Sequence, residues 1–119
     1  MKKTIVLGAS NNPIRYSYSA VQPLNRHGHD VVPVGIKTGA IQGIEIQHGE
    51  PEIEGVHTVT LYLNPKRQAQ YYDYILGLNP KRIIFNPGTE NFELAQLAEK
   101  KGIEVEVACT LVMLSVGNY

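Results

Sequence analysis

The sequence has little of what marks many protein classes. It contains a single cysteine, Cys109, no tryptophan, and 11 basic residues balanced by 11 acidic ones. A lone cysteine excludes an internal disulfide framework, and zero net charge without a basic stripe argues against nucleic-acid binding. The apolar run near the N-terminus is too short for a signal peptide or a membrane span. We therefore expect a cytoplasmic protein with neither nucleic acid nor membrane as partner.

Metal chemistry also lacks support in the sequence. The four histidines are scattered, and with one cysteine they give no spacing typical of a metal site. The same cysteine, Cys109, follows an expected strand, and we interpret it as a small buried apolar residue. No metal ligands are therefore predicted.

What is present suits one small folded unit. The chain has 119 residues, of which 43% are hydrophobic and 18% charged, so residues 1–119 are predicted to form one domain with its own core. The charge is unevenly distributed, because the first 44 residues carry five basic side chains and one acidic one. This excess favours an anionic ligand in the N-terminal third. A domain that holds such a ligand has little material left to enclose a second substrate.

Apolar runs of strand length alternate along the chain with segments of helical pattern. Strands are expected over 4–7, 31–35, 58–63, 81–85 and 103–107, and helices over 16–27, 65–76, 92–101 and 109–116. Between the second and third of these strands we expect a glycine-spaced stretch with one small alternating segment, 44–46. The alternation predicts a Rossmann-like α/β fold, a three-layer sandwich around a mainly parallel five-stranded sheet.

In such folds a ligand binds beyond the carboxyl ends of the strands, where the strand order reverses. The loop after the first strand begins with Gly8, Ala9 and Ser10, whose small side chains allow a phosphate to approach the backbone at a helix start. Polar side chains follow in the same loop and first helical turn, namely Asn12, Arg15 and Ser17. This arrangement predicts an anion site.

The loop differs from the dinucleotide pattern Gly-x-Gly-x-x-Gly, since Ser10 and Pro13 occupy two of the glycine positions. The acid that would hold the ribose of NAD is also missing, because Lys37 follows the second strand. A cation there suits an additional phosphate better than a free ribose diol. The pattern favours a phosphorylated adenosine, such as the one in coenzyme A (CoA).

Several motifs occur in the order found in a known family. They are Gly8-Ala9-Ser10, Asn12-Pro13, Arg15, Ser17, His27-Gly28-His29, Val31-Val32-Pro33-Val34, Ile41-Gln42-Gly43, Asn64-Pro65, Asn86-Pro87-Gly88 and Glu90-Asn91. Together they resemble the small stand-alone CoA-binding domain proteins, and the fold resembles the CoA-binding domain of the succinyl-CoA synthetase alpha subunit.

The resemblance implies a binding role for particular residues. It places Gly8, Ala9, Ser10, Arg15 and Ser17 against the CoA phosphates, and Lys37 against the adenosine phosphate. With the strand-end loops, the expected CoA-binding set is Gly8, Ala9, Ser10, Asn12, Arg15, Ser17, Lys37, Asn64, Pro65, Asn86, Pro87 and Gly88. The phosphorylated histidine of the synthetase lies in a second domain without a counterpart here, so no catalytic residue is assigned.

Three functions remain open from the sequence. The first is binding of CoA or an acyl-CoA through the loop after the first strand, without catalysis by the chain itself. The second is a fragment of an NAD(P)-binding oxidoreductase. The third is the CoA-binding subunit of a multi-chain acyl-CoA ligase, whose partner would be a ligase chain; association with a second copy of this chain is open in each case.

Overall fold

The computed structural model describes residues 2–119. The strands are β1 (Thr4–Leu7), β2 (Val31–Gly35), β3 (Gly39–Ile41), β4 (Ile44–His48), β5 (Thr58–Leu61), β6 (Arg82–Phe85) and β7 (Glu104–Val107). The helices are α1 (Tyr16–Arg26), α2 (Pro65–Gln68), the 3-10 turn η1 (Ala69–Tyr71), α3 (Tyr72–Gly77), α4 (Phe92–Lys100) and α5 (Thr110–Val116). This succession of strands and helices confirms the expected α/β class.

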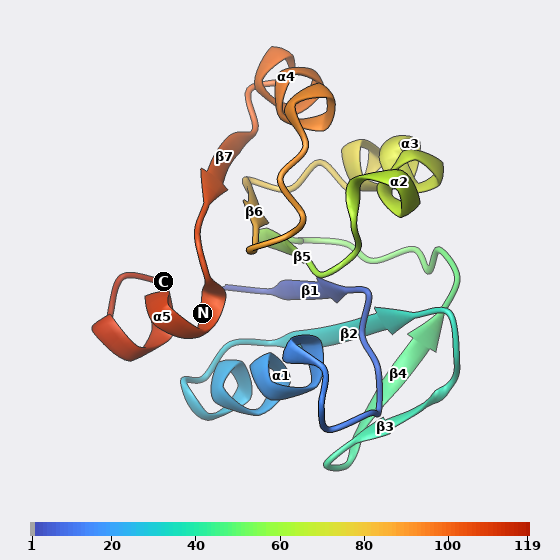
Figure 1. Ribbon diagram of the computed structural model, residues 1–119, viewed down its shortest axis with the longest axis vertical. Coiled ribbons are helices and arrows are strands. Elements are labelled where there is room, and N and C mark those ends of the chain that lie inside the picture. The colour runs from blue at the N-terminus through green and yellow to red at the C-terminus, as the bar shows by residue number, and fades with distance from the viewer. Residues whose placement is uncertain (1) are drawn as a thin grey trace.

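The strands form one sheet in the order β3-β4-β2-β1-β5-β6-β7 (Figure 1). All neighbouring pairs from β4 to β7 are parallel, and only β3 runs antiparallel to β4. The chain builds outward from β1 through β2 and then returns to place β5 on the other side of β1. The strand order therefore reverses between β1 and β5.

The sheet has seven strands, so the expectation of five was wrong. The two additional strands, β3 and β4, form a hairpin within the stretch that we expected to be mainly loop. Gln42 and Gly43 connect them with φ angles of 48° and 88°, as a tight two-residue hairpin turn requires. The sequence signal was weak because β3 has only three residues. In the structure, β4 pairs with β2 through only two register positions.

Two hydrophobic clusters cover the two faces of the sheet. Side chains alternate along each strand, so Ile5 and Leu7 of β1 pack in one cluster with α3 and α4, whereas Val6 packs in the other with α1 and α5. Ile83 and Phe85 of β6 repeat this division with Ile84. The result is a three-layer sandwich, in which the helices leave the carboxyl edge of the central strands to the connecting loops (Figure 1).

Candidate functional site

A cleft of about 1000 Å³ opens at the carboxyl ends of β1, β2 and β5, where the strand order reverses. We call it the carboxyl-edge cleft. It is lined by residues 7–12, 14–17, 34–37, 62–64, 67, 71 and 87–89. Parallel α/β sheets bind ligands in this position because the loops after neighbouring strands diverge there.

The loop after β1 forms the floor of the cleft and lies close to neighbouring backbone. Gly8 has a φ of 97°, and a Cβ on it would lie 3.1 Å from the Tyr62 carbonyl carbon. The N–H groups of Gly8 and Ala9 both donate to the Val34 carbonyl, each at 2.9 Å. A Cβ on Gly35 would lie 2.3 Å from the Ala9 carbonyl oxygen. Glycines at these two positions therefore let the loop lie directly on the ends of β2 and β5.

The same loop leads into α1 through two short turns. The Asn12 N–H donates to the Ser10 hydroxyl at 3.1 Å, and the Asn12 side-chain carbonyl accepts from the Ile14 N–H at 3.1 Å. Arg15 is the N-cap of α1 and makes no side-chain capping bond. Because the first N–H groups of a helix lack partners within the helix, Tyr16 and Ser17 bring free donors and a positive dipole end to the lining.

The charged side chains in the lining of the cleft are all cations. Arg15 comes from the start of α1, Lys37 from the segment after β2, and Arg67 from α2, which follows β5. Within the part of the chain that the structure describes, no Asp or Glu belongs to the lining. The nearest carboxylate along the chain, that of Glu90, accepts a hydrogen bond from the Gly88 N–H at 2.8 Å. The cleft is therefore electrostatically suited to an anion.

Most of the residues predicted for CoA binding are brought together here. The cleft lining contains Gly8, Ala9, Ser10, Asn12, Arg15, Ser17, Lys37, Asn64, Pro87 and Gly88. Pro65 and Asn86 lie outside it. Pro65 is the first residue of α2, whose N-cap Asn64 accepts from the Arg67 N–H at 2.9 Å.

Asn86 is buried, and the polar atoms of its side chain bond to neighbouring strands and to α5. The side-chain N–H₂ group donates to the Thr60 hydroxyl at 2.6 Å and to the Leu61 carbonyl at 2.9 Å. Its side-chain oxygen accepts from the Thr110 N–H at 2.9 Å. Asn86 thus connects the end of β5 to the start of α5, directly behind the cleft.

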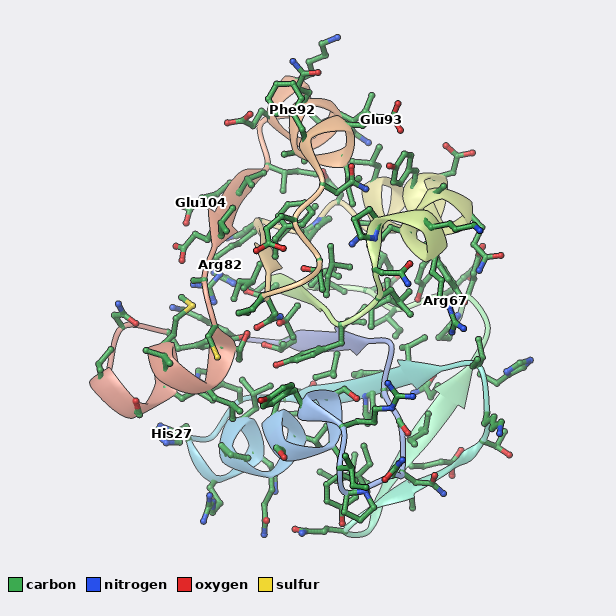
Figure 2. All side chains as sticks on the ribbon, in the orientation of Figure 1. His27, Arg67, Arg82, Phe92, Glu93 and Glu104 are labelled. Carbon is green, nitrogen blue, oxygen red and sulfur yellow. The ribbon has the colours of Figure 1, made fainter. Side chains whose placement is uncertain are left out.

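Sequence reasoning missed several members of the lining. Arg67 is one of them, because a basic residue in a polar helical turn is usually an exposed surface residue, and only the fold places it at the cleft. Figure 2 shows Arg67 beside the carboxyl ends of the strands and Arg82 at their opposite ends. Ile14, Tyr16 and Ile36 are 87%, 75% and 56% exposed at this cleft and add apolar surface to it. Because these three side chains are exposed, they belong to no apolar periodic pattern that the sequence would show.

One ionisable group in the lining is a phenol. Burial raises the pKa of Tyr62 well above its usual value, and hydrogen bonds to Thr110 and Thr60 oppose that shift. The Tyr62 hydroxyl is therefore protonated at neutral pH and cannot serve there as a general base. Cys109 lies outside the lining and is partly buried at the N-cap of α5.

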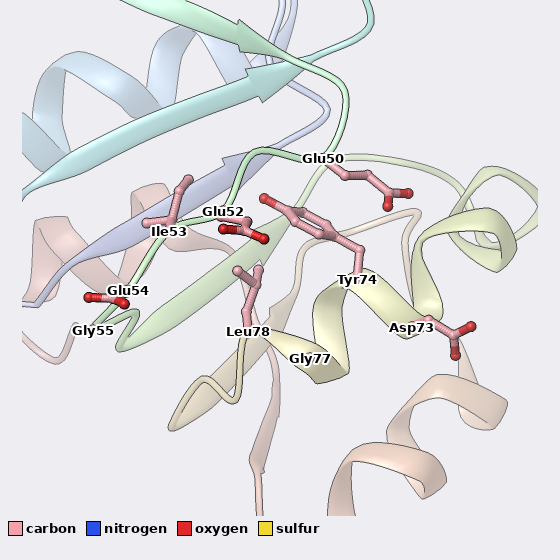
Figure 3. A pocket seen from close by; sticks show the side chains of 9 residues that line it. All are labelled: Glu50, Glu52, Ile53, Glu54, Gly55, Asp73, Tyr74, Gly77 and Leu78. Carbon is pink, nitrogen blue, oxygen red and sulfur yellow. The ribbon is translucent and has the colours of Figure 1, made fainter.

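A second hollow, of about 650 Å³, has the opposite charge (Figure 3). Its lining includes Glu50, Glu52, Glu54 and Asp73 around Tyr74. The Tyr74 hydroxyl donates to the Pro51 carbonyl at 2.6 Å, and burial raises its pKa to about 12. Between residues 2 and 119, no group of three or more His, Cys, Asp or Glu side chains is arranged to hold a metal ion.

The strand order and the helices on both faces of the sheet place the chain among Rossmann-like α/β domains. Residues 2–115 match the model of the family described as "CoA binding domain". The chain belongs to this CoA-binding domain family, as its motifs predicted. Comparison with curated proteins gives no significant match. None of the helices described here is long and apolar enough to cross a membrane.

Solved structures extend the comparison. A crystal structure of an uncharacterized protein is 54% identical, with a TM-score of 0.97 over 100% of this chain and 98% of that chain. A hypothetical protein from Pyrococcus horikoshii is 27% identical, with a TM-score of 0.86 over 97% and 82% of the two chains. A protein from Thermus thermophilus, 21% identical with a TM-score of 0.83 over 99% and 91%, shares the fold.

Proposed function

We propose that the chain binds coenzyme A or an acyl-CoA in the carboxyl-edge cleft and catalyses no reaction by itself. The observation that carries the proposal is a cleft with three cations and no carboxylate among its described lining residues, located where the strand order reverses, in a member of the CoA-binding domain family. CoA carries a diphosphate and a ribose phosphate, so its anionic groups match the cations of this cleft in chemistry.

The cations divide between these groups by position along the sheet edge. Arg15, with the small residues Gly8 and Ser10 and the start of α1, faces the diphosphate. Lys37, one strand away after β2, faces the ribose phosphate. Arg67 approaches the diphosphate from the other side of β1, because α2 follows β5. Asn64, Pro87 and Gly88 then border the path of the pantetheine arm.

Lys37 distinguishes CoA from NAD, whose adenosine ribose carries no phosphate. Dinucleotide-binding folds place an acid after the second strand, whereas here Gly35 ends β2 and Ile36 and Lys37 follow it. A carboxylate in that place would repel the ribose phosphate of CoA, and a lysine attracts it. The chain should therefore prefer CoA over both dephospho-CoA and NAD.

Isothermal titration calorimetry with CoA, dephospho-CoA and NAD tests this function. Wild type should bind CoA most tightly, and Lys37→Ala should lose about 1 kcal/mol of the preference for CoA over dephospho-CoA. Lys100→Ala removes a cation from the end of α4, away from the cleft, and should keep the full preference. Equal affinity of wild type for CoA and dephospho-CoA would remove Lys37 from the site.

The absence of catalysis is tested with the same preparation. Purified protein is incubated with CoA, carboxylic acids and ATP or GTP, and separately with acyl-CoA alone, while thioester and free thiol are followed. No turnover is expected. Multiple turnovers abolished by Cys109→Ser or Arg15→Ala would show an enzyme instead of a binding domain.

A further inference from the structure

The two loops that form one wall of the carboxyl-edge cleft are joined by the buried side chain of Gln68. β5 and β6 pair as far as Leu61 and Phe85, and beyond these residues their backbones are no longer bonded as a ladder. The chain after β5 contributes Leu63 to the cleft, and the chain after β6 contributes Thr89. Gln68, which is fully buried, lies between them.

The amide of Gln68 supplies both hydrogens needed to connect these loops. Its Nε2 donates to the Leu63 carbonyl at 2.7 Å and to the Thr89 carbonyl at 2.8 Å. Two carbonyls cannot bond to each other, so a donor between them is required. The side chain thus acts as an additional rung beyond the end of the β5–β6 ladder.

The remaining oxygen of Gln68 extends the connection to α4. Gln68 Oε1 accepts from Asn91 Nδ2 at 2.9 Å, and the same Asn91 nitrogen donates to the Tyr72 hydroxyl at 2.8 Å. The Asn91 side-chain oxygen caps α4 by accepting from the Leu94 N–H at 3.2 Å. Every polar atom of the Gln68 side chain is therefore bonded, which fixes its orientation.

We propose that Gln68 is a positioning residue that holds the Leu63 and Thr89 loops together in one wall of the cleft, without touching the ligand itself. This inference rests on the proposed function, because the affected ligand is CoA. The hydrogen bonds of the Gln68 side chain go to the loops after β5 and β6 and not to those after β1 and β2, which lead to Arg15 and Lys37. We therefore expect its main effect in the half of the cleft assigned to the pantetheine arm.

Two ligands separate this role from a general role in folding. CoA spans both halves of the cleft, whereas adenosine 3′,5′-bisphosphate carries phosphates for Arg15, Lys37 and Arg67 but lacks the pantetheine arm. In Gln68→Glu the side chain keeps its length but, when ionised, turns acceptors toward both carbonyls. We expect CoA affinity to fall about tenfold and adenosine 3′,5′-bisphosphate affinity to stay within about twofold of wild type.

The titrations are made at a temperature where circular dichroism shows each variant folded, and Gln68→Met replaces Gln68→Glu if the latter does not fold. Ile103→Ala, which removes a buried side chain before β7, controls for lost stability and should leave both affinities unchanged. Hydrogen exchange should accelerate at the Thr89 amide in Gln68→Glu and not in Ile103→Ala.

The outcomes distinguish the proposed function from the positioning role of Gln68. Wild type that binds neither ligand contradicts the proposed function, and the positioning role falls with it. Wild type that binds CoA, with variants that lose affinity for both ligands equally or for neither, contradicts the positioning role alone. Loss of CoA affinity with unchanged adenosine 3′,5′-bisphosphate affinity supports both the proposed function and the positioning role.

Discussion

The two edges of the sheet use their cations in different ways. At the carboxyl edge Arg15, Lys37 and Arg67 line an open cleft. At the amino edge Arg82 is buried, its Nε donating to the Thr58 hydroxyl at 3.0 Å and its Nη1 to the Tyr119 carbonyl at 3.2 Å. Figure 2 shows Arg67 and Arg82 at these opposite edges.

The amino edge is closed by a network of side chains. The guanidinium of Arg82 lies 4.5 Å from the centre of the Tyr119 ring, and Lys2 Nζ also donates to the Tyr119 carbonyl. The Tyr119 hydroxyl contacts the Thr4 hydroxyl at 2.6 Å. Because Thr4 donates to the Lys2 carbonyl, its oxygen accepts from Tyr119. Arg82 and Lys2 at this edge are bonded to the protein itself, whereas Arg15, Lys37 and Arg67 at the carboxyl edge line an open cleft.

The largest effect should come from breaking the shape of the carboxyl edge. In Gly35→Ala the new Cβ would lie 2.3 Å from the Ala9 carbonyl oxygen, so the loop after β1 must move. We expect a loss of about 3 kcal/mol in the free energy of unfolding, with weaker CoA binding, as for severe overpacking. Urea unfolding measures the first and calorimetry the second. Gly77→Ala is the control, since a Cβ there meets nothing within 4 Å; equal behaviour of the two variants would contradict the close contact.

A smaller effect, confined to binding, is expected for Arg15→Ala. Loss of one charge-assisted hydrogen bond should weaken CoA by about 1.5–3 kcal/mol, while the free energy of unfolding changes by less than about 0.5 kcal/mol. Calorimetry and thermal unfolding measure the two quantities. Arg26→Ala, in the last turn of the same helix, should change neither. Unaltered CoA affinity in Arg15→Ala would remove Arg15 from the site.

The opposite pattern is expected at the amino edge. Tyr119→Phe removes the hydroxyl that bonds to Thr4 and should lower the free energy of unfolding by about 1 kcal/mol, because the buried Thr4 oxygen loses its donor. CoA affinity should be unchanged. Chemical denaturation and calorimetry of this variant check both statements, and a loss of affinity without loss of stability would reverse the roles of the two edges.

The smallest expected effect is a pH dependence of stability at the amino edge. Burial and the nearby Lys2 lower the pKa of His29, and His27 and Arg82 add to the shift. Burial and Arg82 also lower the pKa of His57, where Lys2 and Lys81 add to the shift and Glu104 opposes it. The unfolded chain therefore binds more protons as the pH falls through about 6.5, and stability should fall with it.

Urea unfolding between pH 7.5 and 5.5 measures this slope. Replacing both histidines, His29→Gln with His57→Gln, should make the slope shallower. A double variant with the wild-type slope would assign the pH dependence to other groups.

The sequence predicted the main strands and helices and the loop at Gly8, but not all of the residues that line the cleft. The main strands were recognisable because each is a short apolar run, and the loop at Gly8 because strand, small residues and helix follow one another. The β3–β4 hairpin was missed, since β3 has only three residues, too few to show a period-2 pattern.

Residues whose role depends on distant contacts could not be recognised. Gln68 sits in a polar helical turn, and only the fold places its amide between Leu63 and Thr89. Asn86 is predicted as a ligand contact, and the structure shows that its amide bonds to Thr60, Leu61 and Thr110, contacts that the sequence does not reveal. Such roles arise from the packing of segments that are far apart in sequence.

Chemical-shift mapping of CoA on the ¹⁵N-labelled protein tests the central claim most directly, because it reports both edges in one titration. We predict that saturating CoA shifts the backbone amides of Gly8, Ser10, Lys37 and Gly88 and leaves those of Thr58, Arg82 and Tyr119 in place. Shifts centred on Arg82 and Tyr119, or none at millimolar CoA, would contradict the assignment of the carboxyl-edge cleft as a CoA site.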